Sequence, residues 1–335
     1  MKLLVTGGAG FIGSNFIRYI LSRYPNYKII NLDKLTYAGN LDNLSDSEKN
    51  KNYTFIKSDI TDQKLVENIL REKPDAILNF AAETHVDRSI YNPEDFVKTN
   101  IVGTGVLMDA AIKYETPKFI QISTDEVYGS LGKKGTFTEE SNLAPNSPYS
   151  ASKAAADLLC RSYFKTFDFP VIITRSCNNF GPYQFPEKLL PLFISNALSD
   201  NELPLYGDGL NIRDWIYVLD NCRAVDIVLH KGKKGEIYNI SSNNEMTNLE
   251  MTKLILKKLK KPESLIKFVK DRPGHDRRYA LDASKLRGDL GWKPKYSFEE
   301  GINKTVDWYL GNKAWWEKVK SGEYLNYYRK QYHNR

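Results

Sequence analysis

Tyr149 and Lys153 form the pair with the clearest chemical potential in this chain. On a helix, residues at positions i and i+4 lie on the same side, so the phenol and the ammonium would be neighbours. A nearby ammonium stabilises a phenolate, and a cationic nicotinamide would add to that effect. Tyr149 is therefore a candidate general base toward a substrate hydroxyl near neutral pH. Taken alone, a Tyr and a Lys at this spacing are more often an ordinary surface pair.

A glycine-rich turn at residues 7–13 directly follows the first predicted strand and opens a helix that we expect to begin at Ser14. Its glycines allow a tight turn and the close approach of a pyrophosphate, which the free N–H groups of the helix would bind. The spacing is G-x-x-G-x-x-G rather than G-x-G-x-x-G, so the turn alone is a weak signal.

An acidic residue follows the glycine-rich turn at the distance expected of a ribose-binding carboxylate. Asp33 lies twenty residues after Gly13, at the end of the second predicted strand. There it would accept hydrogen bonds from ribose hydroxyls and repel a 2′-phosphate, which favours NAD over NADP. A turn aspartate that caps the residues after it is the alternative. Asp59 and Ile60, at the end of the third strand, could reach the adenine.

Two adjacent carboxyl groups, Asp125 and Glu126, follow Thr124 at the end of another predicted strand. Such a pair could supply the acid and the base of an elimination. By themselves, these residues are more often loop carboxylates, one of which caps a helix.

Together these residues resemble the extended short-chain dehydrogenase/reductase family. The likeness spans most of the chain and rests on Asp33 and on the strings at residues 7–13, 36–40, 81–87, 123–129, 149–153, 175–182, 213–215 and 271–276. It implies NAD-dependent dehydration of a nucleoside-diphosphate hexose, dTDP-glucose, to the 4-keto-6-deoxy sugar and water. The Thr124-Asp125-Glu126 string is decisive, because a 4-epimerase of the same family has no elimination to catalyse.

The resemblance also implies a role for five catalytic residues. Tyr149, assisted by Lys153, would remove the proton of the 4-hydroxyl while the C4 hydride passes to NAD. Thr124 would hydrogen-bond the developing 4-oxygen. Glu126 would take the C5 proton, and a protonated Asp125 would donate to the departing C6 hydroxyl. Such opposite protonation states of neighbouring carboxyls are set by their environments.

The resemblance implies two sets of binding residues. Those expected at the cofactor are Gly7, Gly10, Phe11, Ile12, Gly13, Asp33, Lys34, Thr36, Asp59, Ile60, Ala81, Ala82, Thr99, Tyr149, Lys153 and Asn179. Those expected at the substrate are His85, Thr124, Asn178, Glu187, Lys188, Leu189, Pro204, Tyr206, Arg213, Asn248, Arg272 and His275. Arg213 and Arg272 are expected to pair with the pyrophosphate, which suits the planar fork of arginine. His275 is expected to shape its loop, with an acid–base role as the alternative.

Short apolar runs alternate with helical stretches in the first half of the chain. Strands are predicted at residues 3–6, 28–32, 53–57, 76–79, 118–123 and 171–175. Runs without alternation, such as 76–78, are typical of strands that are covered on both faces. We therefore expect an α/β fold, with a Rossmann-like doubly wound parallel sheet and a smaller α/β substrate-binding domain. The NAD-binding domain would comprise residues 1–177, with 212–240 returning to it; residues 178–211 and 241–335 would hold the nucleotide sugar.

The basic excess of the chain is confined to its last quarter. The chain has 48 Lys+Arg and 41 Asp+Glu, a net charge of +7, which divides into −4 for residues 1–250 and +11 for residues 251–335. One amphipathic surface helix is predicted to carry Lys257, Lys258, Lys260 and Lys261. A nucleic-acid surface is the competing interpretation, for which the candidate stacking residues are Trp308, Trp315, Trp316, Tyr327 and Tyr328. These aromatics fit helix packing equally well and no nucleic-acid motif is present, so we expect no such partner.

The composition, 41% hydrophobic and 27% charged, is that of an ordinary globular protein and excludes disordered and disulfide-rich classes. The three cysteines lack a CxxC spacing and are interpreted as reduced thiols of a cytoplasmic protein. No apolar run approaches the ~18 residues of a membrane span, so we expect no membrane partner. We also expect no metal site.

The identity of the nucleotide base is left open by the sequence, because the Thr-Asp-Glu string also occurs in UDP-glucose dehydratases. A nucleotide-sugar 4-epimerase and a catalytically silent NAD-binding scaffold compete with the dehydratase interpretation. Members of the family commonly pair through two helices. We therefore expect a homodimer formed by residues 96–114 and by the helix that carries Tyr149 and Lys153.

Overall fold

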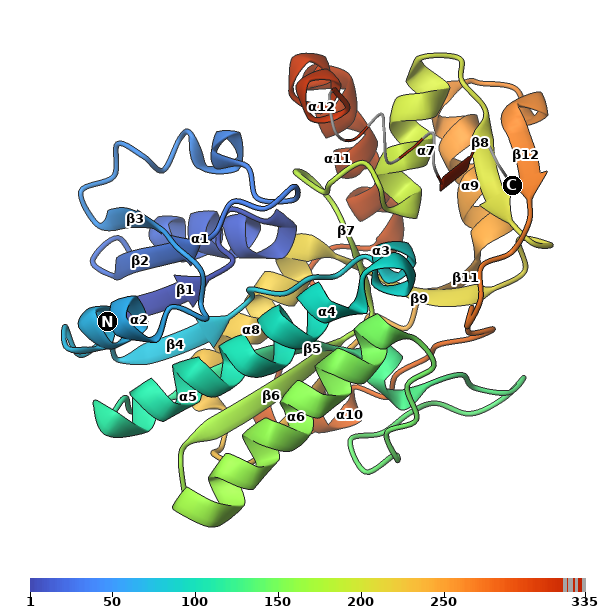
Figure 1. Cartoon of the computed structure of the whole chain (residues 1–335). Coiled ribbons are helices and arrows are strands. Elements are labelled where there is room, and N and C mark those ends of the chain that lie inside the picture. Colours follow the sequence, from blue (N-terminus) through green and yellow to red (C-terminus); the bar gives the residue numbers. More distant parts are fainter. Residues whose placement is uncertain (322–323, 325–327, 329–330, 333–335) are drawn as a thin grey trace.

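Seven parallel strands form the central sheet, in the order β10-β6-β5-β4-β1-β2-β3 (Figure 1). The structure, a computed structural model, describes residues 1–321, 324, 328, 331 and 332. The strands are β1 (Lys2–Thr6), β2 (Lys28–Asp33), β3 (Tyr53–Lys57), β4 (Ala76–Asn79), β5 (Phe119–Thr124), β6 (Val171–Ser176) and β10 (Ile237–Ile240). Six of these are the strands predicted from apolar runs, each within one residue at either end. The doubly wound α/β fold is confirmed.

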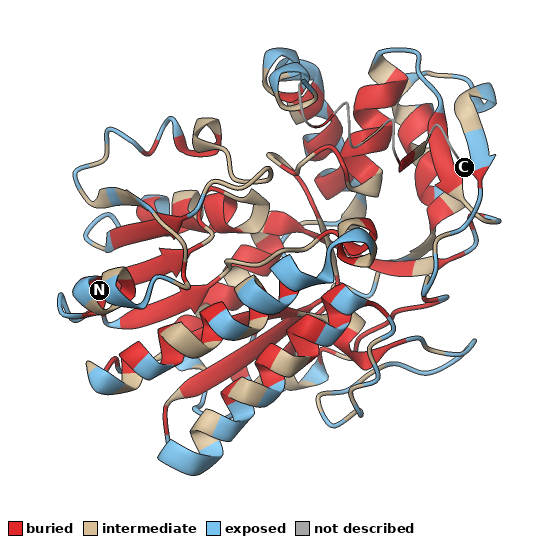
Figure 2. Ribbon diagram, in the orientation of Figure 1, coloured by how far each residue is buried: buried red, intermediate tan, exposed pale blue. Residues whose placement is uncertain are grey.

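Helices cover both faces of this sheet, which is why most residues of its strands are buried; the edge strand β3 is the exception (Figure 2). On one face, Leu3 and Val5 pack in a core to which α1 and α8 contribute; on the other, Leu4 packs in a core shared with α2, α5 and α6. The helices are α1 (Phe11–Arg23), α2 (Gln63–Leu70), α5 (Thr104–Lys113), α6 (Pro148–Phe167), α8 (Val218–Lys231) and α10 (Ser284–Leu290). Chain order moves outward from β1 to β3 and then returns to β4, so the strand order reverses beside β1, where α/β sheets bind ligands.

A second layer of structure lies against the carboxyl end of the sheet. It contains a three-stranded sheet of β7 (Asn178–Phe180), β9 (Ile212–Tyr217) and β11 (Glu245–Thr247) and a two-stranded sheet of β8 (Leu203–Tyr206) and β12 (Ile266–Val269). Its helices are α7 (Leu189–Leu198), α9 (Asn248–Leu259), α11 (Phe298–Gly311) and α12 (Lys313–Val319). They share a core around Phe193, Trp215 and Tyr309. Of the segment expected to return to the first domain, β10 joins the large sheet and β9 the small one. The domain boundaries stay a prediction.

Short helical segments connect these elements near the carboxyl ends of the strands. They are η1 (Leu41–Leu44), α3 (Val86–Tyr91), α4 (Pro93–Phe96), the π-helix η2 (Val97–Gly103), η3 (Asp125–Tyr128) and η4 (Glu263–Leu265). The segment from Pro93 to Lys113 is thus one nearly continuous helical run that packs beside α6 (Figure 1).

Two sequence-based expectations about helix ends were wrong. The helix after the glycine turn begins at Phe11 rather than Ser14, because Gly10, in an extended conformation, already occupies the N-cap position. Helix α9 ends at Leu259, and Lys260 adopts a left-handed conformation with φ +55, so Lys260 and Lys261 lie beyond the helix that carries Lys257 and Lys258.

Four of the five candidate stacking residues of the basic C-terminal quarter pack inward. Trp316 is buried, and Trp308, Trp315 and Tyr328 pack against the same core; Tyr327 lies outside the described residues. The cysteines Cys160, Cys177 and Cys222 are free and buried. Within the described part of the chain, no helix combines the length and apolar character needed to cross a membrane.

Candidate active site

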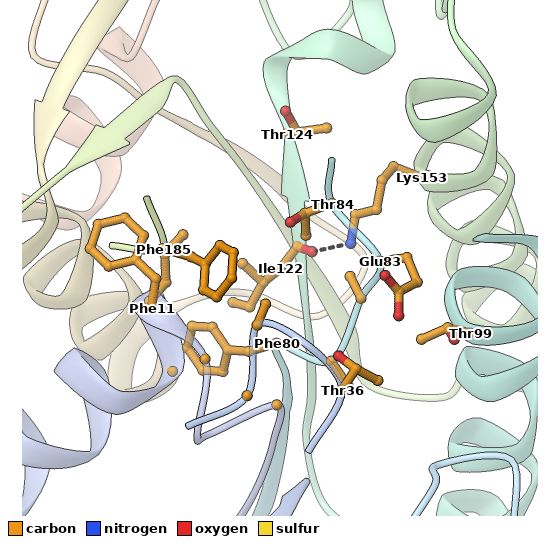
Figure 3. A pocket seen from close by; sticks show the side chains of 18 of the residues that line it. Phe11, Thr36, Phe80, Glu83, Thr84, Thr99, Ile122, Thr124, Lys153 and Phe185 are labelled. Atoms are coloured by element: carbon orange, nitrogen blue, oxygen red, sulfur yellow. Dashed lines mark hydrogen bonds between the residues drawn. The ribbon is translucent and has the colours of Figure 1, made fainter. Parts of the chain in front are cut away.

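A cavity of about 280 Å³ opens at the carboxyl ends of the central strands, at the reversal of strand order. All sixteen residues expected at the cofactor line it. In Figure 3, the aromatic side chains of Phe11, Phe80 and Phe185 lie on one side of the pocket, whereas Lys153 and the neighbouring polar groups lie on the other. The cavity thus has an apolar wall and a polar wall, as a dinucleotide requires.

The glycine turn brings three backbone segments closer than side chains would allow. Gly7 has φ +66, and a Cβ there would lie 2.5 Å from Ala81 N; a Cβ on Gly13 would lie 2.4 Å from Gly7 O. The α1 helix begins after Gly10 with no side-chain cap, so its first N–H groups are available to an anion. These features fit the pyrophosphate of NAD.

Asp33 stabilises local turns and also faces the cavity in which a ribose could bind. One carboxylate oxygen accepts a hydrogen bond from Ala9 N at 2.9 Å and the other accepts from Leu35 N at 2.8 Å, so the side chain fixes two turns. The residue also lines the cavity, where the remaining lone pairs suit ribose hydroxyls. Burial raises the pKa of this carboxyl, and the two N–H donors oppose that shift. At the neighbouring position, Lys34 pairs with Asp59 at 2.8 Å.

Helix α6 places Tyr149 and Lys153 on the cavity wall. Its start is fixed by Pro148 and by a reciprocal capping box between Ser147 and Ser150. Lys153 Nζ donates to the carbonyl oxygen of Ile122 at 2.6 Å, which is the dashed line in Figure 3. Burial and the carboxyl groups of Glu126 and Asp125 raise the pKa of Tyr149, while a hydrogen bond with Thr124 opposes the shift.

The surroundings of Tyr149 do not by themselves favour a phenolate, and its role as a general base stays a prediction. Its phenol lies in a buried site beside two carboxyl groups, both of which disfavour a phenolate. The ammonium of Lys153 is directed at a backbone carbonyl. A positive charge brought into the cavity by NAD would favour the phenolate, which makes deprotonation of Tyr149 dependent on the cofactor.

The adjacent carboxyl groups at the end of β5 have different environments. Thr124 caps η3 by accepting from Glu126 N at 3.3 Å, and its hydroxyl donates to Asp125 Oδ1 at 3.2 Å. Burial, Glu126 and Asp214 raise the pKa of Asp125 well above its ordinary value. Burial also raises the pKa of Glu126, but Arg272, Lys188 and Arg213 oppose that shift. Asp125 is thus suited to hold a proton, and Glu126 to accept one.

A second cavity of about 150 Å³ adjoins the first, and Glu126, Asn178 and Lys188 line both. Eleven of the twelve residues expected at the substrate line it; the twelfth, Thr124, lines the cofactor cavity. The cations Lys188, Arg213 and Arg272 meet there, which suits an anionic ligand.

Several polar atoms in this second cavity are buried without a hydrogen-bond partner among the described residues. They are Asn178 Oδ1, Asn248 Oδ1, Trp215 Nε1 and Arg272 Nε. Because such groups are normally paired, their presence indicates a polar ligand. His275 Nδ1 pairs with Asp271 Oδ1 at 2.6 Å, and burial lowers its pKa to about 3, which favours the loop-shaping role.

Other residues that line the cavities were not predicted as site residues from the sequence, and three of them are Gln184, Trp215 and Tyr279. Gln184 lines both cavities, and Trp215 and Tyr279 line the second. Trp215 belongs to the 213–215 string of the family resemblance, and this match is the one sequence feature that pointed to a role for it in the site. A fourth residue, Asn100 of the π-helix η2, connects two segments of the site through hydrogen bonds. Its side chain bonds the backbone N and O of Glu83 at 2.9 and 3.0 Å and donates to Ser152 Oγ at 2.8 Å.

Comparisons with known proteins agree with this geometry. A family model described as GDP-mannose 4,6 dehydratase matches residues 4–305. The chain is 52% identical over 340 residues to a dTDP-glucose 4,6-dehydratase of Xanthomonas campestris pv. campestris (strain B100), with 96% of each covered. It is 49% identical to a crystal structure of dTDP-glucose 4,6-dehydratase from Streptomyces venezuelae with NAD bound; the TM-score is 0.93, with 96% of this chain and 100% of that chain covered. A UDP-glucose 4-epimerase structure from Thermotoga maritima is 31% identical, with a TM-score of 0.87 over 93% of this chain and 100% of the other.

Proposed function

We propose that this chain, a member of the GDP-mannose 4,6-dehydratase family, is an NAD-dependent hydro-lyase. Its substrate in this proposal is dTDP-glucose. The products are dTDP-4-keto-6-deoxyglucose and water. One observation carries the proposal: a buried Asp125 suited to hold its proton and a Glu126 surrounded by cations lie beside Tyr149, where the two cavities meet. An epimerase would not need that acid–base pair.

NAD, when bound, takes the hydride from C4 and returns it at C6. Tyr149 removes the proton of the 4-hydroxyl, and the hydroxyl of Thr124 stabilises negative charge on that oxygen. The resulting ketone acidifies the C5 hydrogen, which Glu126 removes. Asp125 donates its proton to the C6 hydroxyl as water departs, and Glu126 then returns the proton to C5.

The cations of the second cavity hold the diphosphate in this proposal. Arg213 is fixed in place, since it donates to Asp276 O at 2.9 Å and lies 4.4 Å from the ring centroid of Tyr279. Arg272 lies 3.8 Å from Asp87 and has an unpartnered Nε within the described residues. Both therefore have donor capacity for phosphate oxygens. Pro204 and Tyr206 also line this cavity, and we place the base beside them.

The experiment that tests the proposal is incubation of the purified protein with dTDP-glucose and, separately, with UDP-glucose. We expect the alkaline absorbance of a 4-keto-6-deoxy sugar with dTDP-glucose and a lower rate with UDP-glucose. A faster reaction with UDP-glucose would transfer the same chemistry to the uridine nucleotide. A galactose product without water loss would show an epimerase instead, and no product with either nucleotide would overturn the proposal.

We also propose a homodimer in the cytoplasm. The helical run from Pro93 to Lys113 and helix α6 lie side by side and expose apolar side chains: Val97, Val102 and Leu158 are 48%, 51% and 55% exposed. Pairing with a second copy would remove this surface from water. The three free, buried cysteines support a reducing compartment.

A further inference from the structure

Arg175 is a buried cation between the two catalytic segments. It lies on β6, and its Nε donates to Asp157 Oδ2 at 2.8 Å; the two side chains are 4% and 1% exposed. Its Nη1 donates to the hydroxyl of Tyr128 at 2.9 Å, and its guanidinium carbon lies 4.8 Å from the centroid of that ring. No role in binding or chemistry has so far been given to it.

Each partner of Arg175 belongs to a different part of the catalytic machinery. Asp157 lies on α6 one turn after Lys153 and two turns after Tyr149, so it is on the same face of that helix. Tyr128 ends η3, the segment that begins with Asp125 and Glu126. The guanidinium therefore joins the segment that oxidises C4 to the segment that removes water across C5 and C6.

The network continues on the far side of Tyr128. The Tyr128 hydroxyl donates to Asn239 Oδ1 on β10 at 2.9 Å, and the backbone N of Asn239 donates to Glu139 Oε1 at 2.8 Å. Phe137 stacks on Tyr128 with ring centroids 4.9 Å apart. The η3 segment is thus tied to the sheet at β6 and at β10.

A contribution to folding stability does not by itself explain why an ion pair is buried. Removing two charges from water costs several kcal/mol, and exchange of such a pair for apolar residues is often neutral or stabilising. Here the pair fixes two segments whose relative position the reaction depends on. We infer that Arg175 is a positioning residue, which sets the spacing between the Asp125–Glu126 segment and the Tyr149–Lys153 pair; this inference rests on the proposed function.

The first test removes both charges together. In the double variant Arg175→Met/Asp157→Leu neither member of this ion pair is left as an unpaired buried charge, so we expect a folded protein. Lys153, which also lies near Asp157, keeps its hydrogen bond to Ile122 O. The link between α6 and η3 is lost, so we expect kcat for dTDP-glucose to fall ~100-fold while KM changes less than ~threefold, as a displacement of about 1 Å would produce. A folded double variant with wild-type kcat would overturn the inference.

The second test separates the two half-reactions. Tyr128→Phe removes only the hydroxyl that joins Arg175 to Asn239. We expect exchange of deuterium at C5 to slow ~tenfold, and NAD reduction, which depends on α6, to change less than ~threefold. The matched control is Tyr238→Phe. Like Tyr128, Tyr238 is a buried tyrosine; it lies on β10, and its hydroxyl accepts a hydrogen bond from Lys233 N. We expect this control to behave as the wild type.

Both measurements are made beside the wild type in the same assay. A wild type that forms no 4-keto-6-deoxy product overturns the proposed function. A wild type that forms it while Tyr128→Phe slows both half-reactions equally, or neither, overturns only the assignment of Arg175.

Discussion

Asp125 and Glu126 are chemically almost the same and adjacent in the chain, yet the proposed mechanism gives them opposite tasks. Asp125 lies deeper, beside Asp214 and Glu126, so its neutral form is favoured even though the hydrogen bond donated by Thr124 opposes that shift. Glu126 faces the two cavities and three cations, so its charged form costs less. The assignment of acid and base depends on this difference in surroundings.

Substitution of each carboxyl by its amide should separate the two tasks. We expect Asp125→Asn to retain reduction of NAD by dTDP-glucose but to slow loss of water at least ~100-fold, because an amide cannot donate an acidic proton. We expect Glu126→Gln to abolish deuterium incorporation at C5 from solvent. Mass spectrometry of the product and absorbance of NADH measure the two steps. Water loss at the normal rate in Asp125→Asn, or persistent exchange in Glu126→Gln, would contradict the assignment.

At this scale the sequence predicted which residues meet, but not all of their contacts. Most residues expected at the cofactor line one cavity because they lie at or near the ends of neighbouring parallel strands, whereas about half of those expected at the substrate come from the second layer of structure. The hydrogen bond from Lys153 to Ile122 O could not be predicted, since it depends on how far α6 stands from β5. The same is true of Asn100, whose partners are distant in sequence.

Among the elements, the strand–turn–helix unit of β1 and α1 forms the turn at which we expect the pyrophosphate. The strands were predictable because parallel, doubly covered strands are continuous apolar runs. The start of α1 was not, because glycine at an N-cap leaves no side-chain signal. The end of α9 could not be predicted for a similar reason. Lys260 ends it in a left-handed conformation, and a lysine at this position is indistinguishable in the sequence from a further helical residue.

Gly13→Ala should weaken NAD binding through this unit. The new methyl would lie 2.4 Å from Gly7 O and 2.8 Å from Gly8 Cα, both backbone atoms, so the turn must move away from α1. A cost of about 1–3 kcal/mol corresponds to a rise in Kd of about five- to 150-fold. Calorimetric titration with NAD measures it. Gly288→Ala on α10 is the control, because a Cβ there meets nothing within 4 Å. Equal NAD affinity in the two variants would show that the close approach at Gly13 is unimportant.

For the whole molecule, the apolar surface of α6 and of its neighbouring helical run should decide the oligomeric state. We expect Leu158→Glu to give a monomer in sedimentation, because it places a charge at the centre of the pairing surface. Leu310→Glu on α11 is the control; Leu310 is similarly exposed, at 53%, and lies on the second layer of structure. A dimer that persists in Leu158→Glu, or a wild type that sediments as a monomer, would rule out this surface.

The position of β10 at the edge of the large sheet also constrains how the chain matures during translation. β10 pairs with β6, although the chain forms β7, α7, β8, β9 and α8 in between. When a ribosome has released the first 177 residues, the nascent sheet therefore presents an unpaired β6 edge, of the kind that recruits other strands. That edge is closed only after residue 240 has emerged. Much of the predicted sugar-nucleotide domain is thus synthesised before the predicted cofactor domain is complete. Truncation of the chain at a single position would therefore yield neither domain intact.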